Sequence, residues 1–172
     1  QDFSAAIGSS VIEKPDLSYL LNQRTTNKLT TEDRSYLCVM PGSKWPGKRW
    51  PVEKYIDVIK SLGGLTNLTN LTRKQKPILL VILGGVGDKE SLELVELAEG
   101  AGIEYISGVG KWNLIDVARV LASASAYFGT DTGLAHLAEA VGTPAFIVLG
   151  PTIEDMGFGP WRQTSKAIGS KL

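Results

Sequence analysis

The residues best suited to chemistry lie between two apolar runs, in residues 128–144. Asp131 and Thr132 are residue types that favour a helix start, and Gly133 lets a ligand approach the backbone closely. Free N–H groups at a helix start and the positive end of the helix dipole together form an anion site. His136, the only histidine in the chain, falls near the first turn of this helix. The segment therefore predicts a strand, a polar turn that can hold an anion, and a short helix.

Three other polar or glycine-rich loops follow predicted strands. They are residues 42–48, which include Ser43 and Lys48, residues 84–88, which end in Asp88, and residues 108–111. The carboxyl ends of parallel strands lie along one edge of a sheet, and ligands bind outside that edge. We therefore expect these loops to lie beside residues 130–136, with Thr130 at the end of its strand.

Apolar runs that alternate with helix-like segments define the expected fold. The expected strands are residues 36–40, 78–83, 103–106, 124–128 and 145–149, and the expected helices are residues 51–62, 89–99, 114–122 and the one that begins near residue 131. Leu62 and Leu114 are predicted to face the core, and Gly63-Gly64 to end the first helix. Strands separated by helices imply right-handed crossovers. The fold class is α/β, a three-layer Rossmann-like parallel sheet.

The charges on this edge favour a phosphate or diphosphate ligand. Lys48 and Arg49 supply positive charge beside a glycine-containing loop, and residues 130–133 supply backbone donors. No G-x-G-x-x-G sequence opens the first helix, and no P-loop is present, which argues against a dinucleotide or a P-loop nucleotide site. No Asp-x-Asp pair or His/Cys cluster indicates a metal site.

Several of these side chains have two interpretations. Asp88 or Glu90 could accept hydrogen bonds from ribose hydroxyls, or could simply stabilise a helix start through its negative charge. For Asp131 we favour a capping and positioning role over proton transfer. For His136 we favour contact with a ligand over a purely structural role. Lys111 could reach a ligand from its loop, and we favour the interpretation as a solvated side chain.

The aromatic and thiol groups near this edge also have structural interpretations. Trp45, Trp50 and Trp112 could form the floor of a cleft, although a tryptophan beside a helix start more often serves packing. Cys38, the single cysteine, lies in an apolar run and is predicted to be a core residue.

The composition excludes some classes of partner. The formal net charge is zero, so a general attraction to nucleic acid or anionic lipid is not supported. No apolar run is long enough to span a bilayer, and the N-terminus lacks a signal-peptide pattern. Residues 1–34 lack a sustained period and are predicted to be an interdomain linker or the remnant of another domain, which leaves residues 35–172 as the folded domain.

Four motifs follow one another over residues 36–152. They are Pro41 to Pro51, Leu83-Gly84-Gly85 with Gly87-Asp88, Asp131-Thr132-Gly133 with His136, Ala138, Ala140 and Pro144, and Gly150-Pro151-Thr152. In this order they resemble the C-terminal half of glycosyltransferase family 9, the lipopolysaccharide core heptosyltransferases with GT-B architecture.

This resemblance implies a donor-binding domain for ADP-heptose or a related nucleotide sugar. It places Lys48, Thr132 and Gly133 at the diphosphate, Asp131 at the heptose and His136 in the same pocket, with Asp88 as the nearest match for a ribose contact. It also implies inverting transfer to a lipopolysaccharide core acceptor, with the acceptor site and the catalytic base in an N-terminal domain. Neither a cofactor nor a divalent metal is expected, and this half alone is expected to be inactive.

Two alternatives to this function remain open, and the resemblance also implies a cellular location. A relative that uses another nucleotide sugar would share these motifs, and a degenerate GT-B-like interaction module would keep the fold without binding nucleotide. The expected location is the cytoplasm of a Gram-negative bacterium, with at most peripheral association with the inner membrane.

Overall fold

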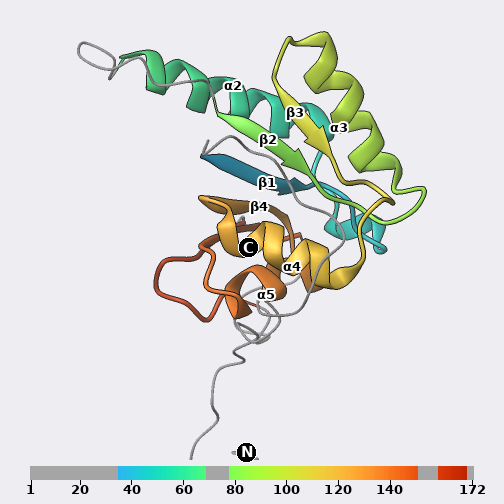
Figure 1. Ribbon diagram of the computed structural model, residues 1–172, viewed down its shortest axis with the longest axis vertical. Helices are drawn as coiled ribbons and strands as arrows, with labels where there is room; N and C mark the ends of the chain where they lie inside the picture. The colour runs from blue at the N-terminus through green and yellow to red at the C-terminus, as the bar shows by residue number, and fades with distance from the viewer. Residues whose placement is uncertain (1–34, 69–77, 151–158, 170–172) are drawn as a thin grey trace, which may run out of the picture.

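The computed structural model describes residues 35–68, 78–150 and 159–169, with side chains described only to residue 62 in the first of these ranges. The expected linker or domain remnant at residues 1–34 lies outside the described residues, as do Pro151 and Thr152. Figure 1 shows the described part as a twisted sheet with helices on both sides.

The described strands form one parallel sheet. They are β1 (Tyr36–Met40), β2 (Leu79–Ile82), β3 (Tyr105–Ser107), β4 (Ala126–Thr130), β5 (Ala145–Val148) and β6 (Lys166–Ile168). The strand order is β3-β2-β1-β4-β5-β6, so β1 lies between β2 and β4 in the middle of the sheet. The chain winds outward in one direction from β1 to β3 and then returns to start the other half at β4. In doubly wound sheets this point of reversal is where ligands bind.

Helices cover both faces of the sheet. They are α2 (Val52–Leu68), α3 (Lys89–Gly100), α4 (Leu114–Ser123) and α5 (Gly133–Ala140), with a short 3-10 turn, η2 (Pro46–Lys48), after β1. In Figure 1, α2 and α3 lie on one face and α4 and α5 on the other. This arrangement confirms the predicted three layers.

Two apolar clusters hold the layers together because alternate residues of each strand point to opposite faces. Cys38 and Val81 join the cluster under α4 and α5. Their neighbours Val39 and Ile82 join the cluster under α2 and α3. All four side chains are fully buried, as expected for strands covered on both sides.

Cys38 is a core residue, as predicted. It is fully buried in the middle of β1, and burial raises the pKa of its thiol far above the ordinary value. The thiolate that a nucleophile requires is therefore not available at neutral pH.

Four details of the predicted fold were wrong. Helix α2 continues through Gly63-Gly64 to Leu68, because glycine lowers helix propensity without ending a helix unless the backbone turns into the left-handed region. Leu62 and Leu114, predicted to be inward, are 36% and 63% exposed. Leu114 is the first residue of α4, whereas Leu62 lies within α2, which continues beyond it to Leu68. Strand β6 was not predicted, since its three residues are too few to show a period.

None of the helices among the described residues is long and apolar enough to cross a membrane.

Candidate functional site

A short charged contact at the carboxyl edge joins the loops after β1 and β4. Lys48 Nζ lies 2.6 Å from Asp131 Oδ2, although the two residues are 83 positions apart in the chain. Met40 pairs with Gly129 across the two strands, so the loops that follow them start side by side. The Asp131 side chain is only 3% exposed and that of Lys48 20%, which makes this a largely desolvated ion pair.

The loop that carries Lys48 is fixed by its own hydrogen bonds. The Ser43 hydroxyl accepts from the Trp45 amide at 3.2 Å, and Arg49 Nε donates to the Ser43 carbonyl at 2.8 Å. Arg49 Nη1 also lies 2.8 Å from Glu90 Oε1, at the start of α3. Arg49 therefore braces the Lys48 loop against the neighbouring helix, and Ser43 contributes to the shape of that loop.

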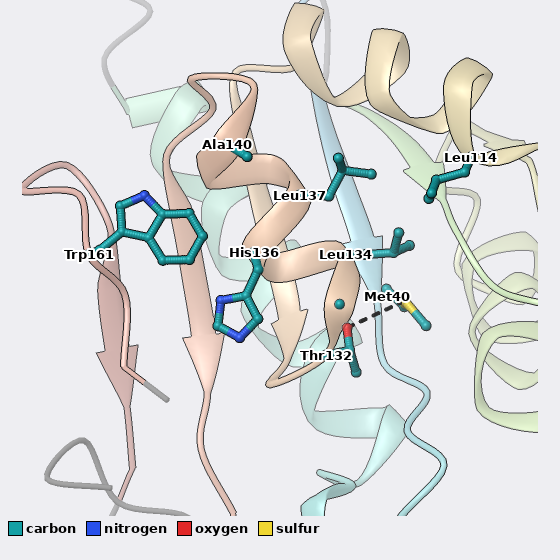
Figure 2. Close-up of a pocket in the computed structure, with 9 residues that line it drawn as sticks. Met40, Leu114, Thr132, Leu134, His136, Leu137, Ala140 and Trp161 are labelled. Carbon is teal, nitrogen blue, oxygen red and sulfur yellow. Dashed lines mark hydrogen bonds between the residues drawn. The ribbon is translucent and has the colours of Figure 1, made fainter. Parts of the chain in front are cut away.

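Thr132, and not Asp131, occupies the N-cap position of α5. The predicted capping role of Asp131 was wrong, because the helix starts one residue later than that role requires. The Thr132 side chain makes no capping hydrogen bond and instead contacts the Tyr127 hydroxyl at 3.5 Å and Met40 Sδ at 3.8 Å, the latter drawn as a dashed line in Figure 2. Around the position where a Cβ would stand on Gly133 there is open space, as predicted for a close approach to the backbone. The start of α5 is therefore open on the side of Gly133.

His136 lies on the first turn of α5. Its Nε2 is 3.6 Å from Asp131 Oδ1, so Asp131 lies between Lys48 and His136. The imidazole stacks on the indole of Trp161, with ring centroids 5.3 Å apart and planes inclined by 9°. Figure 2 shows the two rings on the same side of α5. Lys48, Asp131, His136 and Trp161 thus form a continuous row of contacts.

Thr130 has a structural role that the sequence did not indicate. It is fully buried, and its hydroxyl donates to the Gly42 carbonyl at 2.7 Å, which ties β4 to the loop after β1. The Tyr127 hydroxyl donates to the Thr130 carbonyl at 3.4 Å. Burial raises the pKa of the Tyr127 phenol, which keeps it a hydrogen-bond donor at neutral pH.

Asp88 serves the backbone of its own helix. It is the N-cap of α3, and its Oδ1 accepts from the Ser91 amide at 3.0 Å. Its carboxylate also packs over Gly42, where a Cβ would stand 2.1 Å from Asp88 Oδ2. The structure thus supports the helix-start interpretation of Asp88, and the ribose contact stays a prediction. Lys111 is exposed, as expected.

Two of the three tryptophans named from the sequence follow the packing interpretation. Trp50 packs edge-on against Tyr55 and Phe128, and Trp112 fills the space above Gly108, so both serve packing. Trp45 is 66% exposed. The tryptophan that reaches the site is Trp161, which the sequence did not single out.

A hollow of about 500 Å³ lies over the exposed side of α5 (Figure 2). It is lined by Met40, Leu114, Thr132, Gly133, Leu134, His136, Leu137, Ala140 and Trp161. Of the predicted site residues, Thr132, Gly133 and His136 line this hollow. Lys48 and Asp131 form the charged pair beyond His136, while Ser43, Thr130 and Asp88 support the loops behind it. Within the described ranges, no three His, Cys, Asp or Glu side chains converge where they could hold a metal ion.

Residues 10–172 match the sequence profile of glycosyltransferase family 9 (heptosyltransferase), and the chain belongs to this family. The predicted family membership is thereby confirmed. Lipopolysaccharide heptosyltransferase 1 of Escherichia coli strain K12 is 30% identical over 99% of this chain and 49% of its own length. The enzyme of the same name from Escherichia coli O18:K1:H7 is 29% identical over 99% of this chain and 48% of its own length. The chain therefore spans about half the length of these curated relatives.

Solved structures of heptosyltransferases share the fold. The Escherichia coli heptosyltransferase WaaC with ADP has a TM-score of 0.69 and 26% identity, covering 98% of this chain and 48% of that one. The Escherichia coli ADP-heptose LPS heptosyltransferase II has a TM-score of 0.64 and 25% identity, covering 88% of this chain and 42% of that one. The α/β fold with GT-B relatives is as predicted.

Proposed function

We propose that this chain is the donor-binding part of an inverting glycosyltransferase that transfers heptose from ADP-heptose. The observation that carries the proposal is the Lys48–Asp131 ion pair, placed where the sheet reverses its winding and beside the open start of α5. A cation and free helix N–H groups that converge on one point suit a diphosphate. The ADP and ADP-heptose in the names of structurally similar heptosyltransferases support the choice of nucleotide and sugar.

The ion pair would change partners when a donor binds. The diphosphate would take the place of Asp131 beside Lys48, because its charge is larger and its oxygens can also reach the N–H groups of residues 132–133. Asp131 would then be available to accept hydrogen bonds from hydroxyls of the sugar. His136, next to Asp131, would border the same subsite.

The proposed reaction is a single displacement. A base in another domain removes the proton of an acceptor hydroxyl, and that oxygen attacks the anomeric carbon of the donor. The bond from this carbon to the diphosphate oxygen breaks, and its electron pair leaves with ADP. Lys48 and the start of α5 stabilise the negative charge that develops on the leaving diphosphate, a preorganised electrostatic contribution. We propose that the reaction uses the nucleotide sugar as substrate without a separate cofactor or metal.

The acceptor would be a lipopolysaccharide core, bound by an N-terminal domain that also supplies the base. With its donor half alone, the chain would bind nucleotide without turnover. We propose a cytoplasmic location with at most peripheral contact with the inner membrane, because the acceptor of such a reaction is a membrane lipid.

Calorimetric titration of the 172-residue chain with ADP-heptose, ADP and UDP-sugars tests the proposal. We expect selective binding of the adenine nucleotides, lost in Lys48→Ala and Asp131→Ala. Lys44→Ala is the matched control, since Lys44 is an exposed lysine of the same loop. Preference for a UDP-sugar would show a relative with a different donor. No nucleotide binding by a folded chain would overturn the proposal in favour of an interaction module.

A further inference from the structure

Glu139 is a fully buried carboxylate on α5. The backbone N–H of Trp161 donates to both carboxylate oxygens, with its nitrogen 3.1 Å from Oε1 and 3.4 Å from Oε2. The backbone N–H of Arg162 also donates to Oε1, at 3.0 Å. Arg162 Nε donates in return to the Glu139 carbonyl oxygen. Burying a carboxylate is costly unless it is hydrogen-bonded, so these bonds fix residues 161–162 firmly against the helix.

The segment after Trp161 is held at its other end as well. The Ser165 hydroxyl accepts from the Ala145 amide at 3.0 Å, and β6 (Lys166–Ile168) pairs in parallel with β5. The position of Trp161 is therefore set by two separate anchors, one on α5 and one on the sheet.

His136 depends on this arrangement for its orientation. It lies one helical turn before Glu139, so both residues lie on the same side of α5. Its Nδ1 is buried and has no hydrogen-bond partner among the described residues. The ring is instead held by the Trp161 stack and by the contact of Nε2 with Asp131.

We propose that Glu139 and Trp161 are positioning residues that hold the His136 imidazole against Asp131. Glu139 fixes the backbone of Trp161, the indole fixes the plane of the imidazole, and the imidazole edge meets the carboxylate that also binds Lys48. The consequence for donor binding rests on the function proposed above, whereas the orientation of His136 does not.

Because His136 is the only histidine, its ring protons give unambiguous NMR signals in the full chain. In the wild-type chain we expect these signals to be shifted upfield by the ring current of the stacked indole. Trp161→Leu should abolish the shift, and Trp161→Phe should retain part of it. Glu139→Gln removes the charge but keeps an acceptor, so its signals should lie between those of the wild type and Trp161→Leu. Trp45→Leu is the matched control, since Trp45 is exposed, and should leave the signals in place.

Unchanged His136 signals in a folded Trp161→Leu chain would overturn the proposal, and so would equal shifts in Trp161→Leu and Trp45→Leu. Should Trp161→Leu fail to fold, Trp161→Phe and Glu139→Gln decide the question by the same signals.

A titration with ADP then tests the link to the donor site. Loss of the stack should weaken ADP binding by about 2- to 10-fold, the range expected for one aromatic pair. Wild-type affinity in a variant that has lost the ring-current shift would overturn that link. If the wild-type chain does not bind ADP, the proposed function fails, while the NMR result still decides the orientation.

Discussion

Asp131 and Asp88 both follow buried strands and precede helices at the same edge of the sheet, yet they have different partners. Asp88 directly precedes α3 and caps it through the Ser91 amide. Asp131 is separated from α5 by Thr132, so its carboxylate contacts Lys48 and His136 instead. An offset of one residue thus decides whether an aspartate caps its own helix or pairs with charged and polar side chains. Arg49 connects the two corners, because it binds the Lys48 loop and Glu90.

The largest effect on stability should come from breaking the ion pair at the Asp131 corner. Lys48→Met removes the positive charge that pairs with the nearly buried Asp131 carboxylate. We expect the free energy of unfolding to fall by about 2–4 kcal/mol. This is less than for a fully buried pair, because the Lys48 side chain is partly exposed. Adding Asp131→Asn should recover much of this loss. Urea unfolding of the two single variants and the double variant measures the coupling, and simple additivity would contradict the interpretation.

The next effect concerns the packing of the Asp88 corner against the Lys48 loop. Gly42→Ala would place a Cβ 2.1 Å from Asp88 Oδ2, which forces the carboxylate from its capping position. We expect a loss of about 1–2 kcal/mol by urea unfolding. Gly85→Ala is the matched control, since its Cβ would meet open space. Equal losses in the two variants would show that the Asp88 contact is unimportant.

A smaller effect separates the capping role of Asp88 from any role in binding. Asp88→Ala should cost about 1 kcal/mol of stability, whereas Asp88→Asn should cost only a few tenths because asparagine caps equally well. Thermal unfolding gives both values. If Asp88→Asn keeps its stability but binds ADP more weakly, the carboxylate also contacts the ribose, and the two corners are less different than their hydrogen bonds suggest.

The smallest effect concerns the link between the corners. The Arg49–Glu90 pair is partly exposed, with side chains 37% and 18% accessible, so Arg49→Ala should cost no more than about 1 kcal/mol. Arg49→Lys should be more stable than Arg49→Ala but less stable than the wild-type chain. The reason is that lysine cannot bind Glu90 and the Ser43 carbonyl at the same time as arginine does. Thermal unfolding at low and high salt tests this, and a salt-independent loss would indicate that the Ser43 hydrogen bond dominates.

Much of the fold could be predicted from the sequence because each buried strand is a short apolar run, followed within three residues by a glycine or proline. The position of Lys48 beside residues 130–133 followed from the parallel sheet alone. Its direct pairing with Asp131 did not, because Asp131 and Thr132 are both good N-cap residue types and the sequence alone does not decide which of them caps α5. Glu139 and Trp161 could not be found this way. In the sequence, Glu139 resembles an ordinary acidic residue of a helix surface, and its partners lie 22 and 23 positions away.

The position of Cys38 provides an internal reporter of folding. A thiol that is fully buried in the central strand, inside the apolar cluster under α4 and α5, meets an alkylating reagent only when the sheet itself opens. The rate of its modification therefore measures how often the whole domain unfolds, without any engineered label. A bound nucleotide that holds the loops after β1 and β4 together would slow that rate in proportion to its affinity and concentration.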